Sequence, residues 1–579
     1  MDHPRPTVAI LGGGINGAAL ARELVLSGVD VTLIESGDLA CGATAWSTRL
    51  VHGGLRYLEY GELDLVRESL TERERLVTLA PHLVQSLRFA IPLERRTGGL
   101  WAAAARLLGA SAWAKTLSGG RPRGSWAVGI GLWLYDLLSG RGWPRHGMHR
   151  SGDAGLPEVD QQRYPLAATY VDAQMLFPER FTVELLQDAR DLAAQAGTSL
   201  RVFTHRRVTA DHDGTLHLEP DPNAQAAGLS ERVSLKPQAI VNATGAWVDR
   251  TRGAVPLAAD GPALIGGTKG SHLLLDSQRL RERLHETGVY AEAADGRPVF
   301  VLPFGERLVL VGTTDLPYQG DPTKAVASNE EIDYLLAACG HLFPDTAPTR
   351  EHLLLHYCGV RPLPRAGSEL LPGAVTRRHM LVRHAGTAVP SWSIVGGKLT
   401  TCRSLAESAA GDVLAALGWP RGETSRHRPL PGRAGAESAE SRQRLREELR
   451  THGLSPHAAT RLVQLFGGQA AELVSAAADG GAGPGRSGLL ATLVRRSVVA
   501  EWAVTLDDVV SRRLLLPFDP ACDRATLRAV AEVLASMGHL PEDRINEEVA
   551  RVADDLACRH GRQLVERVAA DGGLISWGE

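Results

Sequence analysis

Between residues 7 and 35 the apolar positions of the chain change their spacing twice. Thr7 to Leu11 is a short β-branched and apolar run, the following residues up to Leu26 place apolar side chains at helical spacing, and a second apolar run ends in Glu35. Glycines at 12, 13, 14 and 17 separate the first run from the helical pattern. The segment therefore predicts a strand, a glycine turn, a helix and a second strand.

Further along, apolar spacing predicts both helices and strands. Helices are expected over residues 61–90, where Pro81 ends or kinks the pattern, and from Phe181 to Ala196, ending at Gly197. Strands are expected within 199–210, 239–247, 265–276 and 297–315, and residues 392–401 predict a strand, a double-glycine turn and a helix start. The runs between 265 and 315 predict an antiparallel sheet, which is a surface suited to a substrate pocket.

The last part of the chain predicts helices alone. Residues 416–438 are rich in Pro, Gly, Ser and Arg and are typical of a linker. Beyond them, Thr505 and Asp508 fit a capping box in which Asp replaces Glu. Pro541 precedes a long amphipathic pattern from Glu542 to Ala569, for which we expect one helix.

The glycine turn at the start of the chain has the chemistry of a dinucleotide site. Gly12 permits a tight turn, Gly14 lets the backbone approach a pyrophosphate, and Gly17 lets the helix pack close to its strand. Glu35 is placed to accept a hydrogen bond from a ribose hydroxyl, and an acid here disfavours a ribose phosphate. The ligand is therefore FAD or NAD rather than NADP. The small-residue turn Ala243-Thr244-Gly245-Ala246-Trp247 after an apolar strand favours FAD, because such a turn covers its adenosine side in flavoproteins.

Composition narrows the class of protein. The chain has 579 residues, of which 44% are hydrophobic and 22% charged, as in a soluble globular enzyme of about three domains. A net charge of −3 predicts no general affinity for nucleic acid. The six cysteines are scattered without metal-like spacing, so we expect reduced thiols and no metal site. We also expect a cytoplasmic protein without a signal peptide.

Residues 95–150 depart from this composition. They contain five of the eleven tryptophans, and their nine lysines and arginines face the single acid Asp136. Charged residues interrupt every apolar run, so the segment cannot span a bilayer. Arginine and tryptophan on amphipathic stretches are typical of a segment that lies in the interface of an anionic membrane. The alternative is a pair of core helices with a solvated basic face.

Several motifs together resemble one family, the FAD-dependent glycerol-3-phosphate dehydrogenases. These are GGGINGAALAR at the start, STRLVHGGLRYLE at 47–59, VNATGAWVD at 241–249, KGSHLLL at 269–275, VGTTD at 311–315, GVRPL at 359–363, GGKLTTCR at 396–403 and EWAVTLDDVVSRR at 501–513. The resemblance implies oxidation of sn-glycerol 3-phosphate to dihydroxyacetone phosphate, with FAD reduced and electrons passed to membrane quinone.

The fold implied by the resemblance is α/β, with a glutathione-reductase-like FAD-binding domain, an interleaved antiparallel-sheet substrate domain and an all-helical C-terminal domain. On this basis the FAD-binding domain comprises 1–83, 155–260 and 366–415, and the substrate domain comprises 84–154, which includes the interfacial segment, and 261–365. The linker at 416–438 leads to the helical domain at 439–579. The implied location is cytoplasmic and peripheral, on the inner face of the cell membrane. The oligomeric state is left open, with a homodimer as one alternative.

The resemblance also implies which residues form the site. A phosphate dianion calls for arginine, whose planar fork matches phosphate oxygens, and removal of hydride from a secondary alcohol calls for a base near neutral pKa. His272 is the candidate base and Arg361 a second catalytic residue; the substrate contacts are Arg56, Tyr57, Arg361, Arg377 and Lys398. Lys398 has an alternative role as a hydrogen-bond donor to the flavin, and His272 an alternative role as a structural histidine. The implied FAD contacts are Gly12, Gly14, Ile15, Asn16, Gly17, Glu35, Thr44, Ser47, Thr48, Leu50, His52, Gly53, Gly54, Ala243, Thr244, Gly245, Gly397, Lys398, Leu399 and Thr400.

The chain departs from the family pattern at several points. Residues 175–181 replace an Asp-x-Arg run, Cys402 replaces a tyrosine, and Ala45 and Trp46 replace small hydroxyl residues in the flavin loop; Ala19 and Glu23 replace Gly and Asp. These departures leave open a related phosphorylated or carboxylated alcohol as substrate. Two further alternatives are an FAD-dependent oxidase that uses oxygen and a flavin-bound binding protein without turnover.

Overall fold

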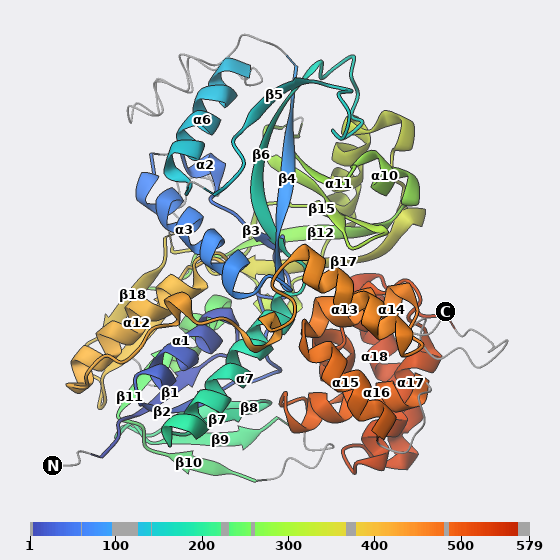
Figure 1. Cartoon of the computed structure of the whole chain (residues 1–579). Coiled ribbons are helices and arrows are strands. Elements are labelled where there is room, and N and C mark those ends of the chain that lie inside the picture. The colour runs from blue at the N-terminus through green and yellow to red at the C-terminus, as the bar shows by residue number, and fades with distance from the viewer. Residues whose placement is uncertain are drawn as a thin grey trace.

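The computed structural model describes residues 4–58, 61–94, 125–140, 142–221, 231–255, 261–293, 295–365, 378–479 and 486–565. Three bodies of secondary structure are visible in Figure 1: a parallel sheet with its helices at the lower left, a larger sheet above it, and a group of helices at the lower right. Strands of the two large sheets alternate along the chain. The predicted domain boundaries within that alternation stay a prediction.

The parallel sheet contains the first strand of the chain. Its strands, in the order in which they pair, are β18 (Met380–His384), β19 (Ser391–Val395), β11 (Ala239–Asn242), β1 (Thr7–Leu11), β2 (Asp30–Ile34) and β7 (Leu200–Phe203). All pairs are parallel except β18 with β19. Because helices cover a parallel sheet, its strands are continuous apolar runs, and Val8, Ala9, Ile10 and Leu11 are all buried.

Helix α1 (Ile15–Leu26) leads from β1 to β2 and is buried along most of its length. It packs against α7 (Pro178–Ala196) and α12 (Cys402–Leu417). A small antiparallel sheet of β8 (Arg206–Ala210), β9 (Leu216–Pro220) and β10 (Val233–Leu235) follows β7. The run 199–210, predicted as one strand pattern, is therefore two strands in two sheets, because the chain turns at His205, which has a φ of +54°.

The large sheet carries the candidate substrate residues. Its strands are β3 (Leu50–Val51), β4 (Val84–Leu93), β5 (Gly147–Arg150), β6 (Leu166–Met175), β12 (Thr268–Asp276), β13 (Thr287–Glu292), β14 (Pro298–Phe304), β15 (Leu308–Gly312), β16 (Leu316–Pro317) and β17 (Leu353–Arg361). Pairing is antiparallel except between β13 and β4. Around it lie α2 (Leu55–Leu58), α3 (Leu63–Leu79), α6 (Ser125–Leu138), α10 (Gln278–Arg283) and α11 (Asn329–Leu342), whereas α9 (Val248–Ala254) packs on β11 and β19 of the parallel sheet and on β8.

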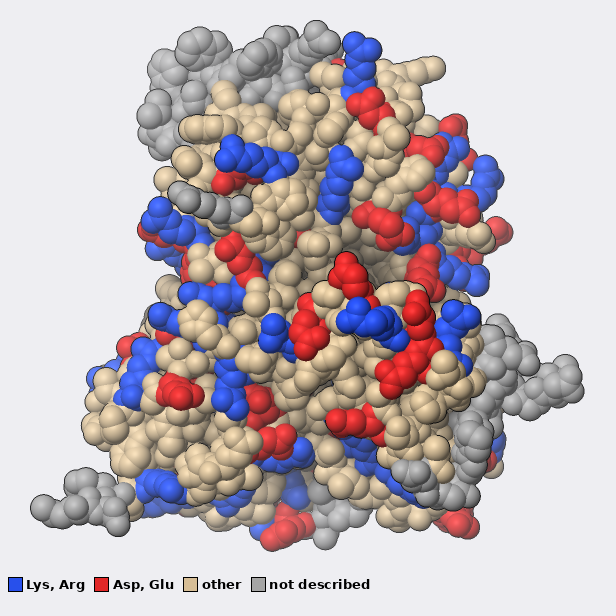
Figure 2. Space-filling model, viewed as in Figure 1, with Lys and Arg blue, Asp and Glu red and all other residues tan. Residues whose placement is uncertain are grey.

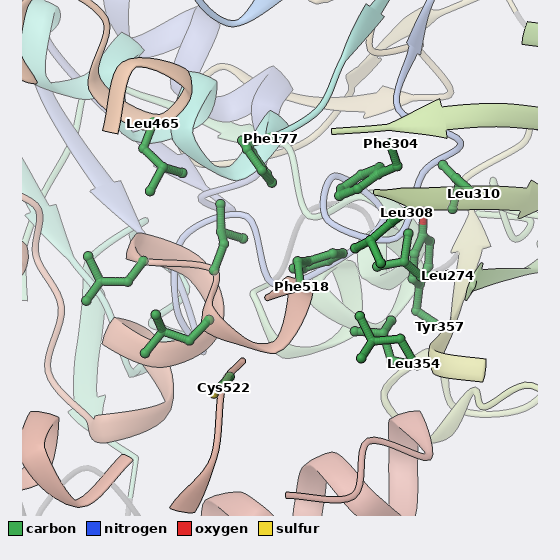
Figure 3. Packing of buried hydrophobic residues seen from close by; sticks show 14 of the residues in the cluster. Phe177, Leu274, Phe304, Leu308, Leu310, Leu354, Tyr357, Leu465, Phe518 and Cys522 are labelled. Carbon is green, nitrogen blue, oxygen red and sulfur yellow. The ribbon is translucent and has the colours of Figure 1, made fainter. Parts of the chain in front are cut away.

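The C-terminal helices pack on β17 of the large sheet and on α7 beside the parallel sheet. They are α13 (Ala439–Thr451), α14 (Pro456–Phe466), α15 (Gln469–Asp479), α16 (Arg486–Val499), a π-helical segment η8 (Asp508–Arg513), α17 (Arg524–Ser536) and α18 (Ile545–His560). Figure 3 shows Phe518 of this part against Phe304 of the large sheet, with ring centroids 5.7 Å apart, and Phe177 beside both. One apolar core therefore continues from the large sheet into the helices.

Two predicted helices differ from the observed ones in their extent. The pattern over 61–90 gives a helix that ends at Leu79, just before Pro81, where the sequence predicts its end or a kink. Beyond it, Val84–Leu93 pairs with β6 as a strand, which is a long-range contact that local spacing does not reveal. The helix expected from Glu542 to Ala569 begins at Ile545 and ends at His560, because Gly561 adopts the left-handed conformation of a helix C-cap. The helix predicted to end at Gly197 does so, although it begins at Pro178 instead of Phe181.

Candidate active site

The glycine turn between β1 and α1 depends on the absence of side chains. Gly12 has a φ of +111°, and a Cβ atom on it would lie 2.6 Å from the carbonyl oxygen of Ala243. A Cβ on Gly17 would overlap the carbonyl oxygen of Gly12. Gly14 is the N-cap of α1 and has no side chain to obstruct its N-terminus. The turn thus leaves backbone exposed where a pyrophosphate would approach.

Glu35 closes this turn from the end of β2. Its carboxylate accepts hydrogen bonds from the backbone N–H of Gly13 at 2.7 Å and of Gly37 at 2.8 Å. On the other side of β1, the N–H of Ala243 donates to the carbonyl of Leu11, and Thr244 Oγ1 donates to Asn242 Oδ1. Residues 35 and 243–245 therefore flank the turn at the carboxyl edge of the parallel sheet, where ligands of open α/β sheets bind.

A second pair of loops meets near the N-terminus of α12. Thr400 Oγ1 accepts a hydrogen bond from the N–H of His52, and a Cβ on Gly397 would lie 2.9 Å from Asn16 Nδ2. The Oδ1 atom of Asn16 is buried without a hydrogen-bond partner among the described residues. Thr44 Oγ1 accepts from the N–H of Ile15. A glycine cradle, an acid at the ribose position and an orphaned buried acceptor together fit an extended dinucleotide such as FAD.

His272 lies on β12, opposite Gly312 of β15 and Tyr357 of β17. Its ring is 1% exposed and stacks on Tyr357 with centroids 4.9 Å apart, while Nε2 lies 2.9 Å from Thr48 Oγ1. The Nδ1 atom has no hydrogen-bond partner in the described part of the chain. Burial, together with the guanidinium groups of Arg361 and Arg49, holds the pKa of His272 well below its usual range.

Arg361 ends β17 on the same face as His272. Its Nη1 donates to Asp315 Oδ1 at 3.0 Å and its Nη2 to Thr313 Oγ1 at 2.8 Å. The guanidinium lies over Gly270, where any side chain would overlap it. Since Gly270 and His272 are two residues apart on one strand, they face the same side of the sheet. The structure thus places His272, the candidate base, and Arg361, the candidate phosphate-binding residue, on one face of the sheet.

Lys398 and Tyr57, both predicted substrate contacts, lie against each other. The Nζ atom of Lys398 lies 3.7 Å from the ring centroid of Tyr57 and 3.4 Å from Ser69 Oγ. Arg56 belongs to α2, but its side chain lies outside the described part, and Arg377 lies outside the described residues altogether. Their predicted substrate contacts therefore stay predictions.

The predicted flavin loop is held by groups that sequence reasoning did not assign. The hydroxyl of Tyr357 donates to the carbonyl of Ser47, and the hydroxyl of Tyr135 donates to Asp172, whose carboxylate also accepts from the N–H of Gly53. Burial raises the pKa of Asp172, although Arg73 opposes the shift. Tyr357 lies two residues before the GVRPL motif, and its role depends on strand pairing. Of the other predicted FAD contacts, Leu50 lies in β3, and Gly54, Gly245 and Leu399 lie in the turns already described.

Two of the departures from the family pattern serve packing. Glu179 binds the buried guanidinium of Arg49 through both carboxylate oxygens, and Arg180 binds Glu501 through two nitrogens. Trp46 packs between Tyr357 and His560, with ring centroids 5.6 and 4.8 Å away. All six cysteines lie in the described part, and none forms a disulfide.

Three comparisons with known proteins agree. Residues 7–403 match the family model of FAD dependent oxidoreductases. A protein of Synechocystis named glycerol-3-phosphate dehydrogenase is 34% identical over 87% of each chain, and one of Brucella abortus named D-erythritol 1-phosphate dehydrogenase is 31% identical over 87% of this chain and 93% of its own. A solved glycerol-3-phosphate dehydrogenase of Bacillus halodurans, complexed with FAD, superposes with a TM-score of 0.71 at 20% identity and covers 98% of this chain and 97% of its own.

Proposed function

The chain belongs to the family of FAD-dependent glycerol-3-phosphate dehydrogenases, and we propose that it oxidises sn-glycerol 3-phosphate to dihydroxyacetone phosphate and passes the electrons to a membrane quinone. The observation that carries the site assignment is the placement of Arg361 and His272 on one face of β12 and β17. That face carries a guanidinium and a buried imidazole, which in this proposal bind the phosphate and take the hydroxyl proton.

In this proposal Arg361 binds the substrate phosphate, supported by Lys398, Tyr57, Arg56 and Arg377. Asp315 and Thr313 fix the guanidinium of Arg361, so its orientation is set before substrate binds. FAD, when bound, accepts hydride from the carbinol carbon.

His272 takes the hydroxyl proton. Its lowered pKa keeps the imidazole neutral at pH 7, and only one of its two ring nitrogens is occupied by Thr48. The other ring nitrogen, Nδ1, has no hydrogen-bond partner among the described residues, and it can accept a proton in the tautomer in which Nε2–H donates to Thr48 Oγ1. The neutral imidazole can accept the proton, but its lowered pKa makes it a weaker base than the near-neutral one that the sequence predicts.

Anaerobic addition of glycerol 3-phosphate to the purified flavoprotein tests this function. The oxidised flavin absorption should bleach in one turnover, and a soluble quinone analogue should restore it. A flavin that stays oxidised would favour a binding protein without turnover. If oxygen reoxidises the reduced flavin rapidly and the quinone analogue does not, the result would favour an FAD-dependent oxidase.

A second substrate has support from the comparisons. The relative named D-erythritol 1-phosphate dehydrogenase is nearly as similar as those named for glycerol 3-phosphate. Both substrates are phosphate esters of polyols, so Arg361 and His272 would serve either one. Values of kcat/KM for the two compounds decide between them, since specificity is a ratio of these values.

Helix α6 supports contact with a membrane surface. Ile130, Trp133 and Leu137 are 48%, 60% and 66% exposed and lie on one face of the helix, whereas Leu132 and Tyr135 on another face are buried. On the face of the molecule in Figure 2, Lys and Arg are interspersed with Asp and Glu. Among the described helices none is long and apolar enough to cross a membrane. An exposed apolar helix face fits peripheral attachment beside the quinone pool.

Replacing Trp133 and Leu137 with serine should weaken binding to anionic vesicles by about 2 kcal/mol, because two apolar side chains no longer leave water. Cosedimentation measures the binding, which should also fall as salt rises. Quinone reduction should decline while reduction of a soluble dye is spared. Trp126, Arg121 and Arg123 are further predicted contacts, but their side chains lie outside the described part.

Val499 offers a control for this experiment. It is 78% exposed at the end of α16, in the C-terminal helices, so Val499→Ser removes an exposed apolar group away from α6. This variant should bind vesicles as the wild type does. If the α6 variant loses quinone reduction and dye reduction equally, α6 has a structural role and does not bind the membrane.

A further inference from the structure

A buried ion network joins the C-terminal helices to the loop that follows Glu35. Arg513 donates through Nη1 and Nη2 to the two carboxylate oxygens of Asp38, at 2.8 and 2.7 Å, and Arg512 Nε donates to the same carboxylate. Asp38 is 2% exposed and Arg513 is fully buried. The two arginines are consecutive residues of η8, where the π-helical turn aims both at one carboxylate.

The same helical turn reaches the loop by a second route. Asp508 binds the ring of His205 at 2.8 Å, and the backbone N–H of His205 donates to the carbonyl of Gly37. Burial disfavours a charged imidazole, but the Asp508 carboxylate outweighs it and raises the pKa of His205. The C-terminal helices thus fix Asp38 directly, through Arg513, and its neighbour Gly37 indirectly, through His205.

This loop is part of the nucleotide cradle. The carboxylate of Glu35 accepts from the N–H of Gly37 through Oε1 and from the N–H of Gly13 through Oε2. The N–H of Ala40 donates to the carbonyl of Gly13. Asp38 lies between these contacts. A shift of Asp38 is therefore transmitted to Glu35, the predicted ribose contact, and to Gly13 of the glycine turn.

The three groups Asp38, His205 and Asp508 are also close enough to hold a metal ion. Both carboxylates, however, already bind guanidinium groups, Asp38 those of Arg512 and Arg513, and Asp508 that of Arg512. These arginines supply the positive charge that a cation would bring. The cluster is therefore an ion-pair network in the structure.

We propose that the C-terminal helices form part of the FAD site, with Arg513 and Arg512 acting as positioning residues that hold Asp38 and, through it, the adenosine-side loop 36–40. The proposal rests on FAD as the cofactor and is independent of which substrate the enzyme oxidises. Removing one arginine leaves a buried carboxylate short of a partner, and such a loss is costly in a buried pair. The loop then relaxes, and FAD binds more weakly.

A matched control exists in the same interface. Arg180 of α7 binds Glu501 through a buried fork at 2.6 and 2.9 Å, and so also joins the parallel-sheet region to the C-terminal helices. Among the described residues Arg180 makes no hydrogen bond to residues 35–41, and it meets the Asp38 network only through Glu501, whose backbone carbonyl accepts from Arg513 Nε. Arg180→Met should therefore loosen the interface without moving the nucleotide loop.

The experiment titrates the full-length apoprotein with FAD and with ADP, for Arg513→Met, Arg513→Lys, Asp38→Asn and Arg180→Met, and records thermal unfolding without ligand. We expect Arg513→Met and Asp38→Asn to raise the dissociation constants of both ligands tenfold or more. Arg513→Lys should recover part of that loss. Arg180→Met should change the two dissociation constants less than twofold, although its unfolding temperature should drop about as much as that of Arg513→Met.

Equal weakening by Arg513→Met and Arg180→Met, or no weakening by either, would reduce the network to domain packing and overturn the proposal. If Arg513→Met does not fold, Asp38→Asn and Arg513→Lys carry the test by the same criteria. Because ligand binding is the readout, failure here leaves the proposed reaction intact, and failure of the reaction leaves this inference intact.

Discussion

Replacing His272 with alanine is expected to slow flavin reduction by about a hundredfold to ten-thousandfold while FAD stays bound, which is the range for loss of a general base. The physical reason is that the imidazole is buried, stacked on Tyr357 and kept neutral by its surroundings. Stopped-flow reduction by glycerol 3-phosphate measures the rate, and flavin absorbance measures retention of the cofactor.

The pH profile of the wild type gives a second readout of His272. The neutral imidazole is the active form, and its pKa lies well below 6.5. The reduction rate should therefore stay level as pH falls through 6.5 and decline only in more acid solution. This acid limb should be absent from the residual rate of His272→Ala.

His356→Ala is the control for this change. His356 is a buried histidine on β17 whose pKa burial lowers to about 4, but it pairs with Leu273 and so faces the opposite side of the sheet. Its loss should leave the reduction rate within about threefold of the wild type. A normal rate in His272→Ala would assign the proton to another group or to water.

Replacing Arg361 with lysine is expected to weaken substrate binding by roughly 1.5 to 3 kcal/mol, the value of a lost charge-assisted hydrogen bond. This corresponds to about a 10- to 150-fold higher dissociation constant. Lysine keeps the charge but cannot present a planar fork while also binding Asp315 and Thr313 as the arginine does. Titration of the oxidised enzyme with dihydroxyacetone phosphate measures the affinity without turnover.

Arg307 provides the matched control on the same sheet. It forks the carboxylate of Asp276 at an exposed position, where an ion pair contributes little. Arg307→Lys should leave affinity within about twofold of the wild type. Equal affinities in Arg361→Lys and the wild type would remove Arg361 from the phosphate site.

The sequence by itself determined the features that neighbouring residues control. The turn from Thr7 to Glu35 follows from glycine positions and apolar spacing, and the structure has its strands and helix as predicted. Gly197 ends α7 because glycine adopts the left-handed cap, and the Thr505 and Asp508 capping box forms because its partners are three residues apart. The family also followed from motifs, and the comparisons confirm it.

Only the tertiary structure decided which distant groups meet. Residues 84–93 are a strand because β6 lies beside them, and Arg361 approaches His272 because β17 pairs with β12 in one register out of several. Asp38 meets Arg512 and Arg513 across more than 470 residues of chain. Such contacts depend on topology and strand register, which the local spacing of apolar residues does not encode.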